Sequence, residues 1–239
     1  MRKALIVYGG WEGHEPDKMA ASFSKILQAE DFEIDLSDNL KSFADPDYLS
    51  TLDLIVPIWT MGEIESTWVN HVAEAVADGV GIAGCHGGMC DAFRKEVIWQ
   101  FMTGANWVCH PGGDRVNYRI HISNTSSSLV EGIPDFSVCS EQYYLHVDPA
   151  IEVLATTRFP SEKWYHSSNK EVDMPQAWTK KWGVGRVYYN ALGHNAEIFD
   201  IPEAKEMMRR GFLWAAQGKE LAIRENRNGD EYRSEAKGM

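Results

Sequence analysis

The sequence predicts an α/β protein with a mostly parallel sheet, helices on both faces and a β-rich extension. Three observations predict this fold class. Short apolar stretches alternate with amphipathic stretches over the N-terminal half, as strands and helices do in βαβ units. A turn of small residues, Gly84-Cys85-His86-Gly87-Gly88, directly follows one apolar stretch, as in a strand-to-helix elbow. From about residue 112 to 157 the pattern changes to strand-like stretches separated by polar turns.

The N-terminal half is expected to contain four strands and two main helices. Apolar runs predict strands at residues 4–8, 52–58 and 80–85, and alternation of apolar and acidic residues predicts one at 32–36. Pro16 suits the first helical position and opens a helix with one apolar face: Met19, Phe23, Ile26 and Leu27. Ser66 is the expected N-cap of the next helix, which buries Trp68, Val72, Ala75 and Val76. Right-handed crossovers then give a parallel sheet whose loops at the carboxyl ends of the strands converge.

The C-terminal half is expected to complete the same domain. Strands are predicted at residues 118–123, 152–157 and 186–191, and a last helix opens at Pro202 and ends at Gly218. Residues 1–219 therefore form one predicted domain. Residues 220–239 lack a periodic apolar face and are expected to be a flexible polar tail.

Composition excludes several classes of function. The chain has 239 residues, 44% of them hydrophobic, and a formal net charge of −12. Nucleic acids and anionic membranes require a basic face, so we expect neither as a partner. No apolar run is long enough to span a membrane. Four cysteines without paired spacing, and no signal-peptide pattern, predict a reduced cytoplasmic protein, which could form a homo-oligomer.

Histidines dominate the candidate chemistry. His86 lies at the centre of the elbow, where a nucleophilic serine or cysteine would stand, so ordinary acyl transfer is not supported. His14 follows the first strand and His194 follows the strand at 186–191. Because these loops lie at the same edge of a parallel sheet, the three imidazoles could meet in one crevice. A single loop histidine, taken alone, could equally be hydrogen-bonded or solvated.

Further side chains are candidates for the same crevice. Glu141 could orient an imidazole, accept a proton or complete a metal site, although by itself it would be taken for a surface acid. His110 precedes a turn, where a packing role is as reasonable as contact with a substrate. Indole rings can pack on the apolar face of a sugar, and Trp59 and Trp178 are the best-placed tryptophans. The predicted substrate-binding set is His14, Trp59, Gly87, Gly88, His110, Tyr143, His146 and Trp178.

Several segments together resemble the trehalose-utilisation (ThuA-like) family from residue 4 to about residue 217. They are the elbow, Ser140-Glu141-Gln142-Tyr143, Pro175-Gln176-Ala177-Trp178, residues 183–189 and Leu192-Gly193-His194. The resemblance implies a flavodoxin-like variant of the class I glutamine amidotransferase fold. In that fold the elbow presents a catalytic cysteine. Since His86 occupies that position here, the cysteine–histidine mechanism does not carry over.

The resemblance also implies a role in the catabolism of disaccharides or their 3-keto derivatives, with a partner sugar 3-dehydrogenase. We expect an enzyme in which His86, His194 and Glu141 transfer protons to and from such a sugar, giving isomerisation, elimination or hydrolysis. A second hypothesis is a divalent metal, most plausibly zinc, held by His14, His86 and His194. A third is a non-catalytic carbohydrate-binding or regulatory module on an amidotransferase-like scaffold.

Overall fold

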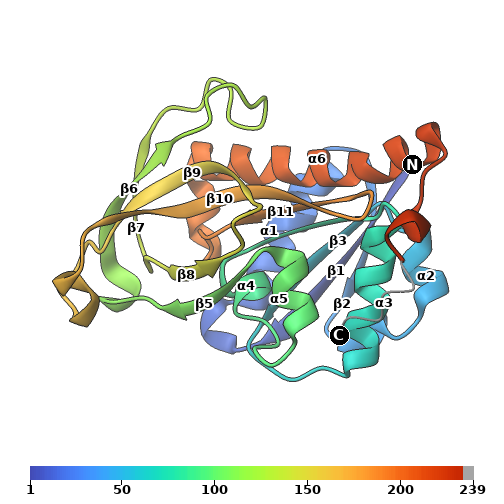
Figure 1. The fold of residues 1–239 in the computed structure, drawn as a ribbon, viewed down its shortest axis with the longest axis horizontal. Coiled ribbons are helices and arrows are strands. Elements are labelled where there is room, and N and C mark those ends of the chain that lie inside the picture. The colour runs from blue at the N-terminus through green and yellow to red at the C-terminus, as the bar shows by residue number, and fades with distance from the viewer. Residues whose placement is uncertain (234–239) are drawn as a thin grey trace.

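A nine-stranded sheet runs through the centre of the molecule (Figure 1). The computed structural model describes residues 1–233. The strands lie in the order β2-β1-β3-β4-β11-β10-β9-β6-β7, and the pairs from β2 to β11 are all parallel. These five strands are β1 (Arg2–Gly10), β2 (Phe32–Ser37), β3 (Leu54–Thr60), β4 (Gly81–Cys85) and β11 (Gly185–Asn190).

The order of the parallel strands confirms the predicted fold class. Counting only these five strands, the sheet reads 2-1-3-4-5, which is the flavodoxin-like order. Strands β3 and β4 are buried over almost their whole length because helices cover both faces, which explains their unbroken apolar runs. Ligands of such sheets bind at the carboxyl ends of the strands.

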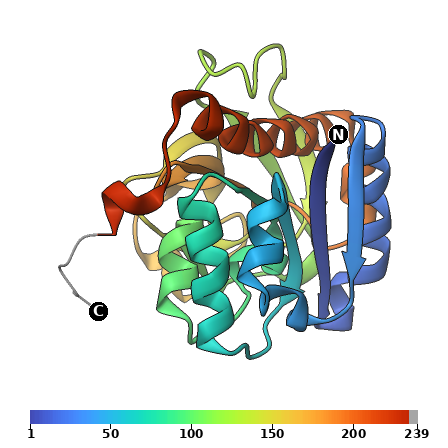
Figure 2. The same ribbon diagram turned by 90° about the vertical axis from the view of Figure 1, so that its right-hand side faces the viewer.

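Helices cover the two faces of the sheet (Figures 1 and 2). One face packs against α1 and α6 in a core that includes Phe23 and Phe212. The other face packs against the remaining helices in a core that includes Val72 and Trp99. The helices are α1 (Pro16–Gln28), α2 (Pro46–Thr51), α3 (Ser66–Ala77), α4 (His86–Cys90), α5 (Val97–Thr103) and α6 (Pro202–Glu225). Short 3₁₀ turns add Glu12–His14, Leu40–Phe43, Gly113–Arg115, Tyr165–Ser168, Ala196–Asp200 and Gly229–Tyr232.

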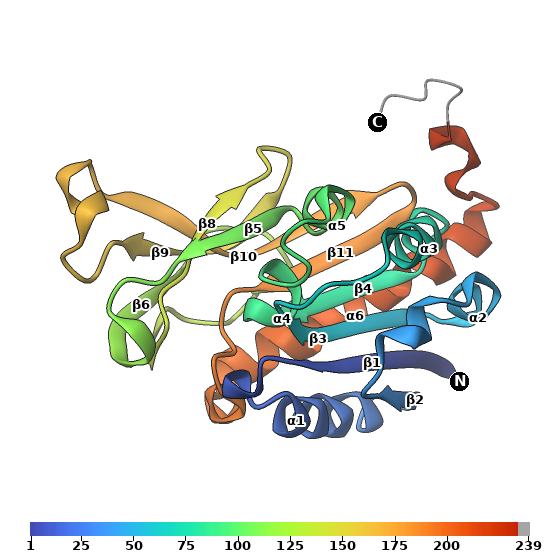
Figure 3. The ribbon, with the colours of Figure 1, turned by 90° about the horizontal axis from the view of Figure 1, so that it is seen from below.

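The predicted β-rich extension joins the same sheet. Strands β10, β9, β6 and β7 continue it with antiparallel pairing. A separate antiparallel ribbon of β5 and β8 lies beside it, near the carboxyl ends of β3 and β4 (Figure 3). These strands are β5 (Ala105–Cys109), β6 (Val116–Ile122), β7 (Phe136–Ser140), β8 (Tyr144–Val147), β9 (Glu152–Phe159) and β10 (Val172–Trp182).

Two predicted helix boundaries are wrong. Glu65, not Ser66, is the N-cap of α3, and the Ser66 hydroxyl instead donates to Glu96. Helix α6 continues past Gly218 to Glu225. Gly218 serves close packing rather than helix termination, because a Cβ there would lie 3.1 Å from the Gly79 carbonyl oxygen. The predicted tail at 220–239 therefore begins inside a helix, and its residues 234–239 lie outside the described part. Within residues 1–233, no helix has the length and apolar character needed to cross a membrane.

Candidate functional site

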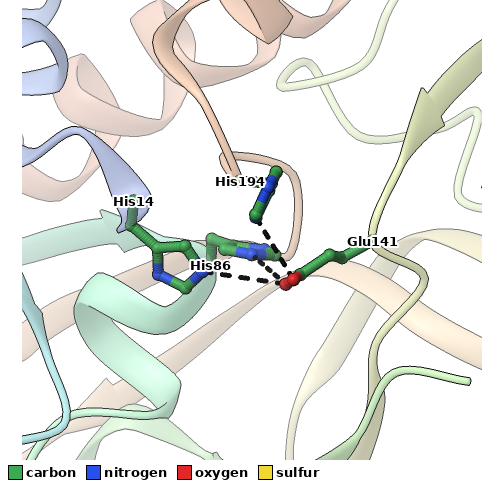
Figure 4. Close-up of side chains that lie close together, drawn as sticks. All are labelled: His14, His86, Glu141 and His194. Atoms are coloured by element: carbon green, nitrogen blue, oxygen red, sulfur yellow. Dashed lines mark hydrogen bonds and ion pairs between the residues drawn. The ribbon is translucent and has the colours of Figure 1, made fainter. Parts of the chain in front are cut away.

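Four side chains from four separate segments meet at the carboxyl ends of the parallel strands (Figure 4). His14 comes from the loop after β1, His86 from the elbow after β4, His194 from the loop after β11 and Glu141 from the β7–β8 connection. One donor atom from each lies within 4.8 Å of the others. The predicted convergence of the three imidazoles is therefore confirmed, and Glu141 completes the set. We call these four residues the His/Glu cluster.

The elbow holds His86 in an unusual backbone conformation. Its φ is +48°, a left-handed value that most non-glycine residues avoid and that is frequent at strained functional turns. The side chain is buried and stacks on the Tyr143 ring, with the ring centroids 3.9 Å apart. Nδ1 lies 2.7 Å from the Ala191 carbonyl oxygen and Nε2 lies 3.0 Å from Glu141 Oε2. Both ring nitrogens thus face an oxygen atom at hydrogen-bonding distance.

Glu141 is the centre of the cluster. Its carboxylate is buried, and Oε2 lies 3.7 Å from His14 Nε2 while Oε1 lies 3.3 Å from His194 Nδ1. Burial by itself would raise the pKa of Glu141, but the surrounding imidazoles outweigh it and hold the pKa well below its usual value. A buried carboxylate is therefore kept ionised.

His14 is oriented by its neighbours on the sheet. Nδ1 is hydrogen-bonded to Thr60 Oγ1 at the end of β3, with a distance of 2.8 Å, so Nε2 faces the carboxylate. Nε2 is buried and has no hydrogen-bond partner in the described residues. Gly87 makes this approach feasible, because a Cβ there would lie 2.8 Å from His14 Cε1. Gly88 packs on the other side of the elbow, against the Ile58 backbone.

His194 is the most exposed member of the cluster, with 14% of its side chain accessible. The Glu141 carboxylate, 3.3 Å from Nδ1, is the main cause that raises the pKa of His194 above its ordinary value. The preceding Gly193 has a φ of +135° and approaches the elbow so closely that a Cβ there would lie 2.8 Å from Cys85 Sγ. A glycine at 193 is thus required to bring the His194 loop against the elbow.

The protonation states of His86 and Glu141 do not match each other. A carbonyl oxygen only accepts, so His86 Nδ1 must carry the proton that it donates to Ala191. Burial lowers the pKa of His86 to about 4, so the neutral ring leaves a lone pair on Nε2. That lone pair faces an ionised carboxylate oxygen at 3.0 Å. Two acceptors at this distance repel each other unless a proton or a metal cation lies between them.

A second layer of side chains surrounds the cluster. His110 is partly exposed and its Nδ1 lies 3.6 Å from Glu141 Oε2, so this predicted residue also reaches the site. The Trp107 indole donates to the same nitrogen over 3.3 Å. Arg94 lies over the Trp107 ring, 4.6 Å from its centroid, and a bidentate ion pair with the buried Asp91 fixes the guanidinium.

The two cysteines next to His86 do not replace the missing nucleophile. Cys85 and Cys90 are buried, and burial raises the pKa of both thiols well above the ordinary value. They remain protonated at neutral pH, whereas a catalytic cysteine needs a thiolate. All four cysteines are free.

Three predicted substrate-binding residues lie elsewhere. The prediction of Trp178 as a sugar platform is wrong: the side chain is fully buried in β10, packs at a tilt against the Tyr189 ring and donates its indole N–H to the Thr103 carbonyl. His146 is exposed on β8 and contacts Tyr144 rather than the cluster. Trp59 packs over Gly9 and Gly62, beside the strand end that carries Thr60, and its role stays a prediction.

Four residues at the site were not predicted from the sequence: Trp11, Thr60, Arg94 and Trp107. Trp11 is exposed at the rim, and its ring meets the His14 ring edge-on with a centroid distance of 4.7 Å. Its position three residues before a candidate histidine, in the same loop, is a signal that could have identified it. Thr60 is a polar residue at the end of an apolar strand, which is a similar signal.

The chain matches the family model of ThuA, described as trehalose utilisation, over residues 3–215. No curated protein matches it. Among solved structures, a ThuA-like protein from Bacteroides uniformis superposes with a TM-score of 0.73 at 18% identity, over 90% of this chain and 91% of that one. A ThuA-like protein from Parabacteroides merdae gives 0.70 at 18% identity, over 91% of each chain.

A cytoplasmic protein from Salmonella typhimurium LT2 shares the fold more distantly. Its TM-score is 0.60 at 12% identity, over 90% of this chain and 98% of that one. At these identities the likeness to solved structures concerns the fold.

Proposed function

The chain belongs to the ThuA, trehalose-utilisation, family, and from that premise we propose that it is an enzyme acting on a disaccharide or its 3-keto derivative. The reaction that we propose is histidine-assisted proton transfer at the His/Glu cluster, leading to isomerisation or to elimination of the glycosidic substituent. A sugar 3-dehydrogenase would supply the keto sugar, and we place this step in the cytoplasm. The family supports a sugar substrate, and the imidazoles and carboxylate of the site support proton transfer.

One observation carries the proposal: a buried, ionised carboxylate surrounded by imidazoles at the ligand-binding edge of the sheet. Ionisable groups are costly to bury, and clusters with strongly shifted pKa values concentrate at functional sites. The left-handed backbone of His86 adds strain at the same point. If these four side chains only stabilised the fold, apolar side chains in their place would do so without the free-energy cost of burying a charge.

His194 is the proposed proton carrier. Its Nδ1 faces Glu141, so Nε2, on the other side of the ring, can face a substrate. The carboxylate raises the basicity of this imidazole, as in carboxylate–histidine pairs of other enzymes. In a 3-keto glycoside, Nε2 would take the proton from C2. The electron pair would then form the C1–C2 double bond as the C1–O bond breaks, and the leaving oxygen would take up a proton.

His86 has a positioning role in this scheme. Its Nδ1–H bond to Ala191 and its stacking on Tyr143 fix the ring, which keeps Nε2 3.0 Å from Glu141 Oε2. Tyr143 is buried, and burial raises its pKa well above the ordinary value, so it acts as a neutral ring.

The cluster is also suited to a divalent metal ion, and we propose zinc. The fit rests on the unpartnered His14 Nε2 and on the two lone pairs that face each other between His86 and Glu141. The partners of both Nδ1 atoms match the outer-shell bonds of ligating histidines. His14, His86 and Glu141 would hold the ion as three protein ligands and leave the fourth coordination position open, as in catalytic zinc sites. If His194 also bound the ion, it would fill that fourth position. A bound zinc ion would polarise the sugar carbonyl.

Solvent exchange tests the reaction. In D₂O, the protein is expected to incorporate deuterium at C2 of 3-keto-trehalose, or to consume this sugar, because His194 exchanges its proton with solvent. NMR follows the C2 proton directly. Binding of the keto sugar without exchange or consumption would contradict the enzyme proposal and would favour a carbohydrate-binding module.

Elemental analysis tests the metal. Protein purified without an affinity tag is expected to retain about one zinc ion per chain, and the His14→Ala variant is expected to lose it. His121→Ala is the matched control. His121 lies on β6, outside the cluster, where it is partly exposed and pairs with Asp135. If wild-type protein holds no stoichiometric metal and a chelator leaves exchange unchanged, zinc is excluded and proton transfer alone remains.

A further inference from the structure

The His/Glu cluster is accessible from one side. Among its members His14 and His86 are buried, whereas His194 keeps 14% of its side chain exposed. The neighbouring His110 keeps 34% exposed. A substrate therefore reaches the cluster at these two histidines, and the His14 ring, from the loop after β1, lies 5.2 Å from the His194 ring.

Trp11 stands at this entrance. Its side chain belongs to the loop after β1, and its backbone N–H donates to the Thr60 carbonyl, so the same residue that orients His14 also anchors Trp11. The indole contacts the His14 ring at 74°, which is an edge contact. Gly13 makes room for it, because a Cβ there would lie 2.4 Å from the indole. The ring is thus held in place although 45% of the residue is exposed.

The second indole near the cluster, that of Trp107, already has protein partners on its N–H and on its ring face. Trp107 uses its N–H to hydrogen-bond His110, and the Arg94 guanidinium covers its ring. It is suited to hold His110 in place. An exposed, fixed indole beside a polar reaction centre is suited to a ligand with an apolar face and a polar rim, and a pyranose ring has both.

We propose that Trp11 is the platform on which a pyranose ring of the substrate packs, with the polar edge of the ring directed to the His/Glu cluster. This assignment rests on the proposed function and adds a residue that decides specificity. The contact is made equally by the ground state and the transition state, so its loss should weaken binding more than it slows the chemical step.

Calorimetry with 3-keto-trehalose and with trehalose tests the assignment. Trp11→Ala is expected to bind either sugar about tenfold more weakly, which corresponds to about 1.4 kcal/mol. The rate of C2 exchange at saturation should fall by less than about threefold. Trp11→Phe should recover most of the affinity, because a flat ring remains. Unchanged metal content in Trp11→Ala would show that His14 keeps its position.

Trp164→Ala is the matched control. Trp164 is equally exposed, at 44%, but it contacts Tyr165 in the β9–β10 connection. Its removal should leave both dissociation constants within twofold of the wild type. Affinity retained in Trp11→Ala, or lost equally in Trp164→Ala, overturns the platform while leaving the proposed reaction intact. A wild-type protein that binds neither sugar contradicts both proposals together.

Discussion

Replacing Glu141 by glutamine is expected to reduce C2 exchange on 3-keto-trehalose by at least about a thousandfold. Glutamine has the same shape, and its amide N–H can donate to the lone pair on His86 Nε2, so the fold should survive. It has no charge, however. The variant can neither increase the basicity of His194 nor supply an anionic ligand for a metal ion. NMR exchange rates, together with the thermal melting temperature, measure both consequences.

Glu12→Gln is the control for this variant. Glu12 lies in the same loop as His14 but is exposed and outside the cluster. The rate of C2 exchange in the Glu12→Gln variant should stay within twofold of the wild-type rate. A Glu141→Gln protein that keeps more than a tenth of wild-type exchange would remove the carboxylate from the mechanism.

Replacing Gly193 by alanine is expected to lower the free energy of unfolding by about 2–4 kcal/mol. Two effects add. A φ of +135° is strained for any residue with a Cβ, and the new methyl group would lie 2.8 Å from Cys85 Sγ and 3.1 Å from His86 Cβ. Relief of this clash must move the His194 loop away from the elbow. Urea unfolding measures the loss of stability, and C2 exchange should fall with it.

Gly132→Ala separates these two effects. Gly132 also has a positive φ, +72°, but nothing lies within 4 Å of the position that its Cβ would take. Its replacement should cost about 1 kcal/mol and leave exchange unchanged. Equal losses of stability in both variants would show that backbone strain alone acts at 193, and that the close approach of the two loops is not needed.

Local patterns in the chain predicted most of the parallel half of the fold. Apolar runs identified β1, β3 and β4 because strands covered on both faces must be apolar along their length, whereas the edge strand β2 followed from alternation. Strand β11 was also predicted. The strand assignment also predicted that the elbow and the loops carrying His14 and His194 lie close together, because parallel strands bring their carboxyl ends to one edge of the sheet. The antiparallel β5, β7, β8 and β10 were not predicted. In β5, β8 and β10 the polar and apolar residues do not alternate cleanly, and β10 contains a bulge around Gln176. Strand β7 alternates in burial but is only five residues long.

The amino-acid sequence by itself therefore determined the fold class, the family and the three histidines that meet. Glu141 was also a candidate from the sequence, but only the tertiary structure decided that its carboxylate is buried among the imidazoles, which tryptophan is exposed and which is core. Glu141 comes from the connection between two antiparallel strands, and Trp11 and Trp178 differ only in what packs around them. Strand and helix periodicity depends on near neighbours in the chain. Burial, tautomer choice and pKa depend on groups brought together from distant segments, and no local pattern contains them.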